Sequence, residues 1–192
     1  VKVEATPAGT PLDNIYQMAY QVPNFYTKVN LLELLLGHDP DMVKVLVFVA
    51  TKALADRLFE QLEKEFGEKL SVIHSNKAQN QRFEAVNRFQ NGDCRILIAT
   101  DVIARGLDVS EVSHVINFDL PELPETYIHR IGRTGRVDKK GIAISFITEK
   151  EQQQQEAIET LMKQPIPLRP LPKLLEISEE LTADEKDTGY HK

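Results

Sequence analysis

The stretch Val43-Lys-Val-Leu-Val-Phe-Val-Ala50 decides the fold class. It is apolar at nearly every position, as strands are when a parallel sheet is covered on both faces. The residues that follow, from Ala53 to Glu65, place Leu54, Leu58 and Leu62 on one helical face. A buried strand that leads directly into an amphipathic helix is typical of α/β proteins.

The same alternation of strand and helix continues on both sides of this stretch. The patterns predict strands at 15–22, 70–73, 95–99, 115–118 and 141–147, and helices at 28–36, 79–90 and 149–162. In the helix at 79–90 we expect Phe83, Val86 and Phe89 to be buried. The order predicts one doubly wound α/β domain over residues 15–162, with a mostly parallel sheet and helices on both faces.

The two ends of the chain differ from this domain in composition. Residues 1–14 contain Pro, Gly and Thr without periodicity, so we expect a remnant of an interdomain linker. Residues 163–192 begin with closely spaced prolines, which favour an extended segment, and continue as an acidic stretch that we expect to be mobile or loosely docked. Because the chain begins at Val1 rather than Met, we expect it to be a piece of a longer polypeptide.

Composition excludes several classes of function. The chain of 192 residues has no apolar run of the roughly 20 residues that a membrane helix needs. Its single cysteine, Cys94, rules out an internal disulfide and favours the cytoplasm, and we expect it to be a small core residue. The net charge of −6 argues against binding nucleic acid by diffuse charge, so any such contact must be a local basic site.

Polar residues follow three of the predicted strands. They are Thr51-Lys52, His74-Ser-Asn-Lys77 and Thr100-Asp101. Ligands of open parallel sheets bind outside the carboxyl ends of the strands, where the N–H groups of a following helix favour a phosphate. Each junction also has a plain structural interpretation, because Thr51, Ser75 and Asp101 are good N-cap residues. Aligned along one edge, the three junctions could follow a phosphodiester backbone.

A dense basic motif, His129-Arg-Ile-Gly-Arg-Thr-Gly-Arg136, precedes the last strand. We expect Arg130 and Arg133 to share a helical face, and Gly135 to break the helix and let the backbone turn. Guanidinium groups that converge from such a turn suit a polyphosphate. The alternative is a cluster of salt bridges with acidic neighbours such as Asp138 and Glu125.

A second constellation is Ala104-Arg-Gly-Leu-Asp108. Gly106 permits a positive φ or the close approach of a ligand, and Asp108 offers a carboxylate that could accept hydrogen bonds from ribose hydroxyls. Taken alone, the segment is equally a turn with a capping aspartate.

Together these stretches closely resemble the motifs of the second RecA-like domain of DEAD-box RNA helicases. Residues 99–108 resemble motif V, and residues 129–136 match motif VI without a mismatch. The other similar stretches are 45–52 (motif IV), 74–82 with Gln79 and Arg82 spaced as Q-x-x-R (motif IVa), and 115–121 (the strand between motifs V and VI). Ser75 stands where the family usually has glycine. The set lies in the family's order across about residues 43–148.

The resemblance implies a role for individual residues. Arg133 and Arg136 would be arginine fingers on the γ-phosphate of ATP, and Gly106 and Asp108 would also contact the nucleotide, Asp108 at its ribose. Arg105 and His129 would join the network that links the two domains when ATP is bound. RNA phosphates would be held, independently of base sequence, by Thr51, Gln79, Arg82 and Thr100.

The sequence lacks other parts that such an enzyme needs. It has no G-x-x-x-x-G-K-[ST] loop, and Asp184-Glu185 is not preceded by the strand that an Asp-Glu-Ala-Asp motif follows. We therefore expect ATP and Mg²⁺ to be bound mainly by an N-terminal RecA-like domain of the same polypeptide. The chain alone is expected to be a monomer without ATPase activity. Five scattered histidines and one cysteine match no metal-ligand spacing.

Two rival functions remain open at this point. One is a non-enzymatic RNA-binding module, because Gly132-Arg-Thr-Gly135 is a G-x-x-G, the loop with which KH domains hold the RNA backbone. A KH domain, however, does not account for Thr100–Asp108. The other rival is a superfamily 2 motor that acts on DNA.

Overall fold

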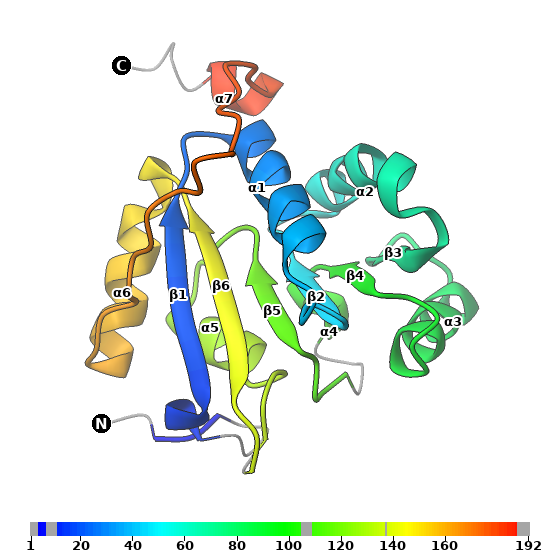
Figure 1. The fold of residues 1–192 in the computed structure, drawn as a ribbon, viewed down its shortest axis with the longest axis horizontal. Coiled ribbons are helices and arrows are strands. Elements are labelled where there is room, and N and C mark those ends of the chain that lie inside the picture. Colours follow the sequence, from blue (N-terminus) through cyan, green and yellow to red (C-terminus); the bar gives the residue numbers. More distant parts are fainter. Residues whose placement is uncertain (1–3, 7–10, 105–108, 137, 188–192) are drawn as a thin grey trace.

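A six-stranded sheet, in which every pair of neighbouring strands is parallel, forms the centre of the molecule (Figure 1). The computed structural model describes residues 4–6, 11–104, 109–136 and 138–187. The strand order is β1-β6-β5-β2-β4-β3. The strands are β1 (Ile15–Gln21), β2 (Val45–Phe48), β3 (Leu70–Ile73), β4 (Ile96–Ala99), β5 (His114–Asn117) and β6 (Gly141–Ile147). Parallel pairing brings all the carboxyl ends to one edge, the upper edge in Figure 1.

Helices cover both faces of this sheet, as the sequence predicts. On one face, α1 (Phe25–His38) and α2 (Lys52–Phe66) pack leucine and valine side chains against the strands. On the other face, α5 (Pro124–Ile131) and α6 (Gln152–Met162) cover β1 and β6, while α3 (Gln79–Gln90) covers β4. The remaining helical elements are α4 (Asp101–Ala104), α7 (Ala183–Asp187) and the short 3-10 turns Leu12–Asn14, Gly67–Lys69 and Glu149–Glu151. The doubly wound α/β fold is confirmed.

Two expectations about elements are wrong. Phe83 is 54% exposed, because α3 buries only Phe89 fully and turns Phe83 away from the sheet. The basic motif is helical only as far as Ile131, so Arg133 lies in the turn beyond α5 and does not share a helical face with Arg130. The expected end of the last long helix, by contrast, is confirmed: residues 149–162 are helical, with Glu149–Glu151 as a 3-10 turn before α6.

The residues after α6 pack against the domain instead of leaving it. Pro167 accepts a hydrogen bond from the Ala19 N–H, and Arg169 donates its N–H to the Ala19 carbonyl, at 2.8 Å each. This pairing extends the sheet beyond β1, and Ile166 is buried beside it. Farther along, Glu185 accepts a hydrogen bond of 2.9 Å from the Phe25 N–H at the start of α1. The segment is extended, as its prolines predict, but it is docked through specific hydrogen bonds.

Candidate nucleotide and RNA interfaces

The residues singled out in the sequence lie at opposite edges of the sheet. Thr51, the start of α3 and Thr100 follow β2, β3 and β4, which are neighbours in the sheet, so they share its carboxyl edge. Arg133 lies at the amino edge, because its carbonyl accepts from Val112 just before β5. Arg136 lies there too, bonded to Lys139 just before β6. The helix α5 runs from the carboxyl edge towards the amino edge, and its length separates these two groups of residues.

Thr51 is the N-cap of α2, and its hydroxyl oxygen accepts the Leu54 N–H at 3.1 Å. The capping interpretation is therefore confirmed for this residue. A hydroxyl group has one donor hydrogen as well as acceptor lone pairs, so capping leaves the O–H available to a phosphate oxygen. The side chain is exposed at the carboxyl edge of the sheet, where a ligand can reach it.

The turn after β3 is organised around the buried His74. Its Nε2 lies 2.8 Å from an Asp56 oxygen, and its Nδ1 accepts the Asn76 N–H at 3.2 Å. Lys52 reaches across from α2 to the Asn76 amide oxygen, at 3.2 Å. The junctions after β2 and β3 are thereby tied together. Ser75 lies in this turn and is not an N-cap, because α3 begins only at Gln79.

At the start of α3, Gln79 is exposed and Arg82 lies one turn farther along. The Arg82 Nε atom is buried and has no hydrogen-bond partner among the residues that the structure describes. A buried donor without a partner is unfavourable. An oxygen-rich ligand such as a phosphate would supply one, and a guanidinium group suits it.

Thr100 and Asp101 form the third junction, after β4. Thr100 is mostly buried, whereas Asp101 is the first residue of α4. The Arg130 guanidinium donates two hydrogen bonds of 2.7 Å each to the Asp101 carboxylate. Asp101 therefore serves as an ion-pair partner, and not as the N-cap that the sequence suggests.

Arg130 is only 2% exposed, although it belongs to the most basic motif of the chain. Besides Asp101, it donates to the Asn117 side chain at 3.1 Å and to the Asp119 carbonyl at 2.7 Å. The guanidinium also lies over the Phe48 ring, 5.0 Å from its centroid. Its contacts thus connect α5 to the ends of β2, β4 and β5.

Arg133 and Arg136 have more open surroundings. Arg133 donates to the Val109 carbonyl at 3.0 Å. The Arg136 side chain is 52% exposed and pairs with Glu111 at 3.4 Å and Asp138 at 3.3 Å. Asp138 is one of the two partners that the salt-bridge interpretation names, whereas Glu111 takes the place of Glu125. Exposed pairs of this kind contribute little free energy, about 0–1 kcal/mol, so a phosphate could replace them.

Glycines shape the turn that carries these two arginines. A Cβ atom on Gly132 would come within 2.6 Å of the Thr6 side chain, which packs there from the N-terminal segment. Gly135 has a φ of +73°, and a Cβ atom there would lie 2.8 Å from the Gly141 nitrogen. The expected backbone turn at Gly135 is present, but it follows the helix end at Ile131 and does not cause it.

Of the four other residues with an expected nucleotide or interdomain role, only one lies within the described residues. Arg105, Gly106 and Asp108 lie outside the described residues. His129 is exposed on α5. Within the described ranges, no group of three or more His, Cys, Asp or Glu residues is arranged to hold a metal ion.

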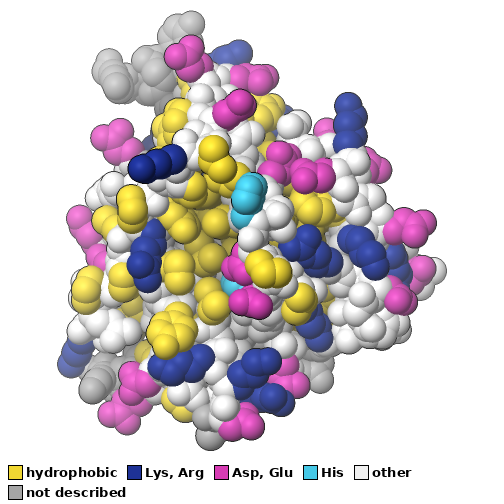
Figure 2. All heavy atoms as spheres, viewed as in Figure 1, with side chains coloured by type: hydrophobic (Ala, Val, Ile, Leu, Met, Phe, Trp, Pro, Cys, Tyr) yellow, Lys and Arg dark blue, Asp and Glu magenta, His cyan; other side chains and the backbone are white. Residues whose placement is uncertain are grey.

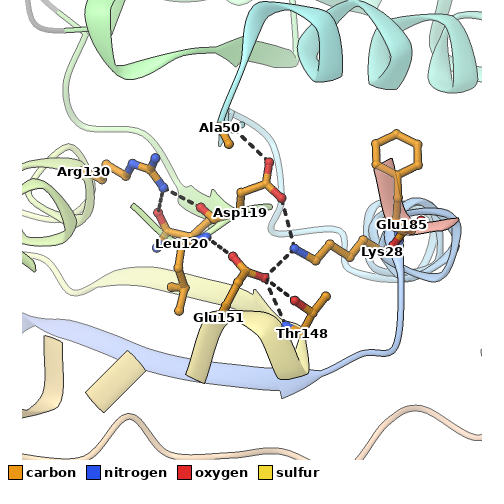
Figure 3. A network of polar contacts seen from close by, with 10 residues as sticks. Lys28, Ala50, Asp119, Leu120, Arg130, Thr148, Glu151 and Glu185 are labelled. Carbon is orange, nitrogen blue, oxygen red and sulfur yellow. Dashed lines mark hydrogen bonds and ion pairs between the residues drawn. The ribbon is translucent and has the colours of Figure 1, made fainter. Parts of the chain in front are cut away.

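A buried network of charges that was not predicted from the sequence supports the carboxyl edge (Figure 3). The Lys28 ammonium group donates to Asp119 at 3.1 Å and to Glu151 at 2.9 Å. Burial lowers the pKa of Lys28, but the two carboxylates outweigh burial and raise it above the ordinary value for lysine. Asp119 also accepts the Ala50 N–H at 2.8 Å. The one sign of it in the sequence is Lys28, a lysine at a position where the apolar pattern of the first helix would place a buried hydrophobic residue.

The visible face of the molecule has no continuous basic surface (Figure 2). On the face shown in Figure 2, an apolar area lies over β1 and β6, and Lys and Arg side chains are interspersed with acidic ones elsewhere. No helix in the described part of the chain is both long and apolar enough to cross a membrane.

Comparison with known proteins identifies the family. The model of the helicase conserved C-terminal domain matches residues 27–138. The DEAD-box ATP-dependent RNA helicase CshA of Bacillus cereus is 38% identical over the whole chain, and RhlB of Shewanella amazonensis is 39% identical over 88% of it. The chain spans 38% of the length of each of these two relatives.

Solved structures agree with this result. The E. coli DEAD-box protein SrmB, solved bound to the regulator RraA, superposes with a TM-score of 0.77 at 33% identity, over 88% of this chain and 98% of that one. The C-terminal domain of the DEAD-box protein Dbp5 gives 0.75 at 36% identity, over 83% and 92%. S. cerevisiae Dbp5 bound to RNA and ADP-BeF3 gives 0.74 at 36%, over 83% and 42%. The chain therefore belongs to the helicase C-terminal domain family, in the form found in DEAD-box RNA helicases.

Proposed function

We propose that this chain is the C-terminal RecA-like half of an ATP-dependent RNA helicase. Such an enzyme would unwind or remodel RNA by hydrolysing ATP between this domain and an N-terminal RecA-like domain. The observation that carries the proposal is the division of the motif residues between two opposite edges of one sheet. A domain built this way can hold RNA at one edge and meet a nucleotide at the other.

The carboxyl edge is the proposed RNA site. The O–H groups of Thr51 and Thr100, the Gln79 amide and the Arg82 guanidinium are donors suited to phosphate oxygens. They belong to junctions after three neighbouring strands, so they can follow consecutive phosphates of one strand. Contacts of this kind carry no base information, because every nucleotide presents the same phosphate.

The amino edge is the proposed nucleotide site. Arg133 and Arg136 would contact the γ-phosphate, where negative charge is stabilised during phosphoryl transfer. Gly106 and Asp108 would contact the nucleotide, and Arg105 and His129 would join the interdomain network. We propose that ATP and Mg²⁺ are held mainly by the N-terminal domain, because this chain has no phosphate-binding loop. The chain alone is then a monomer without ATPase activity, and the enzyme acts in the cytoplasm.

RNA binding by the 192-residue chain tests the proposal. We expect weak binding to labelled oligouridine and oligoadenosine with similar affinities, measured by fluorescence anisotropy. The logarithm of affinity should fall with the logarithm of salt concentration, with a slope of about 0.7 for each phosphate neutralised. Arg82→Ala should reduce both the affinity and the slope. Arg169→Ala removes an exposed arginine beside β1, at the other end of the strand order from β4 and β3, and is the matched control.

Two results would contradict the proposal. A strong preference for one base sequence would favour a non-enzymatic RNA-binding module. Equal effects of Arg82→Ala and Arg169→Ala would show that binding depends only on overall charge.

A further inference from the structure

We propose that Asp119 is a positioning residue, whose carboxylate holds the turn at Ala50 so that Thr51 can reach an RNA phosphate. The inference rests on the proposed function, and specifically on the role of Thr51 at the carboxyl edge. Asp119 itself lies beyond the end of β5 and is not proposed to contact RNA.

The two oxygens of the Asp119 carboxylate have different partners (Figure 3). Oδ2 accepts the Ala50 N–H at 2.8 Å, and Oδ1 accepts from the Lys28 ammonium group at 3.1 Å. Ala50 lies between the end of β2 and Thr51, the N-cap of α2. The backbone of the turn is therefore bonded directly to a charged side chain from the residues that follow the neighbouring strand, β5.

Charge strengthens the bond to Ala50, and burial strengthens the ion pair behind it. A hydrogen bond to a carboxylate is shorter and stronger than one to a neutral acceptor. The Asp119 side chain is 16% exposed and the Lys28 side chain 4% exposed, so water screens their attraction poorly. Lys28 thus restrains the carboxylate on one side, and the carboxylate restrains the Ala50 N–H on the other.

The backbone of Asp119 is held as well. Its carbonyl accepts from Arg130 at 2.7 Å, and the next N–H, of Leu120, donates to Glu151 at 2.6 Å. A side chain can position another group only if its own backbone is restrained. Contacts on both sides of Asp119 meet this condition.

Glu151 provides an internal control. It pairs with the same lysine at 2.9 Å and is similarly buried, with 11% of its side chain exposed. Its side chain also accepts hydrogen bonds from Leu120 and Thr148, and neither of these residues belongs to the three junctions of the carboxyl edge. Loss of either carboxylate removes one partner from Lys28, but only loss of Asp119 releases Ala50.

The experiment compares Asp119→Asn, Glu151→Gln and Thr51→Val in the 192-residue chain. The measurements are affinity for labelled oligouridine, unfolding by urea, and the NMR chemical shift of the Ala50 amide proton. We expect Asp119→Asn and Glu151→Gln to lower stability to a similar extent. Only Asp119→Asn should move the Ala50 resonance. Asp119→Asn and Thr51→Val should each weaken RNA binding roughly 3- to 10-fold, the contribution of one hydrogen bond. Glu151→Gln should weaken it clearly less, because Glu151 contacts this segment only through the Leu120 N–H.

Asp119→Glu gives the same answer if the asparagine variant does not fold. The longer side chain keeps the charge beside Lys28 but displaces the carboxylate from Ala50, so RNA binding should weaken with little loss of stability. RNA affinity that follows stability equally in the Asp119 and Glu151 variants would overturn the inference. So would normal RNA affinity in a variant whose Ala50 resonance has moved.

Failure of the inference can be told apart from failure of the proposed function. If Thr51→Val has no effect on RNA binding while Arg82→Ala weakens it, the carboxyl edge still binds RNA and the role of Asp119 is refuted. If neither variant weakens binding, the proposed RNA site itself is refuted.

Discussion

Arg130, Arg133 and Arg136 stand three residues apart in one motif, yet their surroundings differ. Arg130 is buried and surrounded by hydrogen-bond acceptors, whereas the Arg136 side chain is half exposed. The spacing of the arginines is visible in the sequence. The end of α5 at Ile131 was not predicted, nor was the close packing of the next residue, Gly132, against Thr6, which lies more than a hundred residues away in the chain.

Removal of Arg130 should destabilise the domain, whereas removal of Arg136 should not. Arg130→Ala leaves Asp101 without its paired cation and strips hydrogen bonds from Asn117 and Asp119. We expect a loss of about 3–5 kcal/mol, as for other buried ion pairs that lose one partner. Arg136→Ala breaks only exposed pairs and should change stability by less than about 1 kcal/mol. Urea unfolding of this chain measures both values.

A lysine at position 130 sharpens this comparison. Its single ammonium group cannot reproduce the planar fork that grips Asp101, so Arg130→Lys should recover little of the lost stability. Equal stabilities for the alanine variants at 130 and 136 would mean that the buried contacts of Arg130 are not structurally important.

At the scale of elements, the sequence predicted strands and long helices well. The bounds of β3, α3 and β6 agree with the predicted ones, since each has a continuous or periodic apolar pattern. Helices were expected after Thr100 and within the basic motif, but the bounds of α4 and α5 were not predicted, because four and eight residues are too few for a clear period. The docked path of residues 166–186 was also missed, since its hydrogen bonds are made with β1 and α1.

Docking of this segment predicts an unequal response to two similar substitutions. Ile166 is 2% exposed and packs with α6 and β1, so Ile166→Ala should cost about 2–5 kcal/mol. Leu174 is 74% exposed, and Leu174→Ala should be nearly neutral. Thermal unfolding of the two variants checks this expectation. A mobile tail would make both substitutions neutral.

At the scale of the whole molecule, the parallel sheet separates the two proposed sites. Strand-to-helix junctions gather at the carboxyl edge, and α5 carries the arginine turn back to the amino edge. This separation follows from topology, which the alternation of strands and helices already predicts. The candidate residues themselves were named from the motifs that they resemble, and their division between the two edges was not predicted.

The supporting network could not be named in the same way. Lys28 is 91 residues from Asp119 and 123 from Glu151 along the chain, and no local pattern links them. Each residue alone has the appearance of an ordinary surface charge. Only the fold shows that they meet in a buried place beside the turn at Ala50.

The most direct test joins this chain to an N-terminal RecA-like domain and measures RNA-stimulated ATP hydrolysis. Arg133→Ala and Arg136→Ala should each lower kcat by about 10³–10⁵, or roughly 4–7 kcal/mol of barrier, because an arginine finger acts mainly in the transition state. Binding of ATP should change much less, and lysine at either position should not restore turnover. Arg82→Ala should instead raise the RNA concentration needed for half-maximal stimulation, with kcat at saturating RNA close to normal. A near-normal kcat in Arg133→Ala and Arg136→Ala would contradict the account and leave these arginines as structural and salt-bridging residues only.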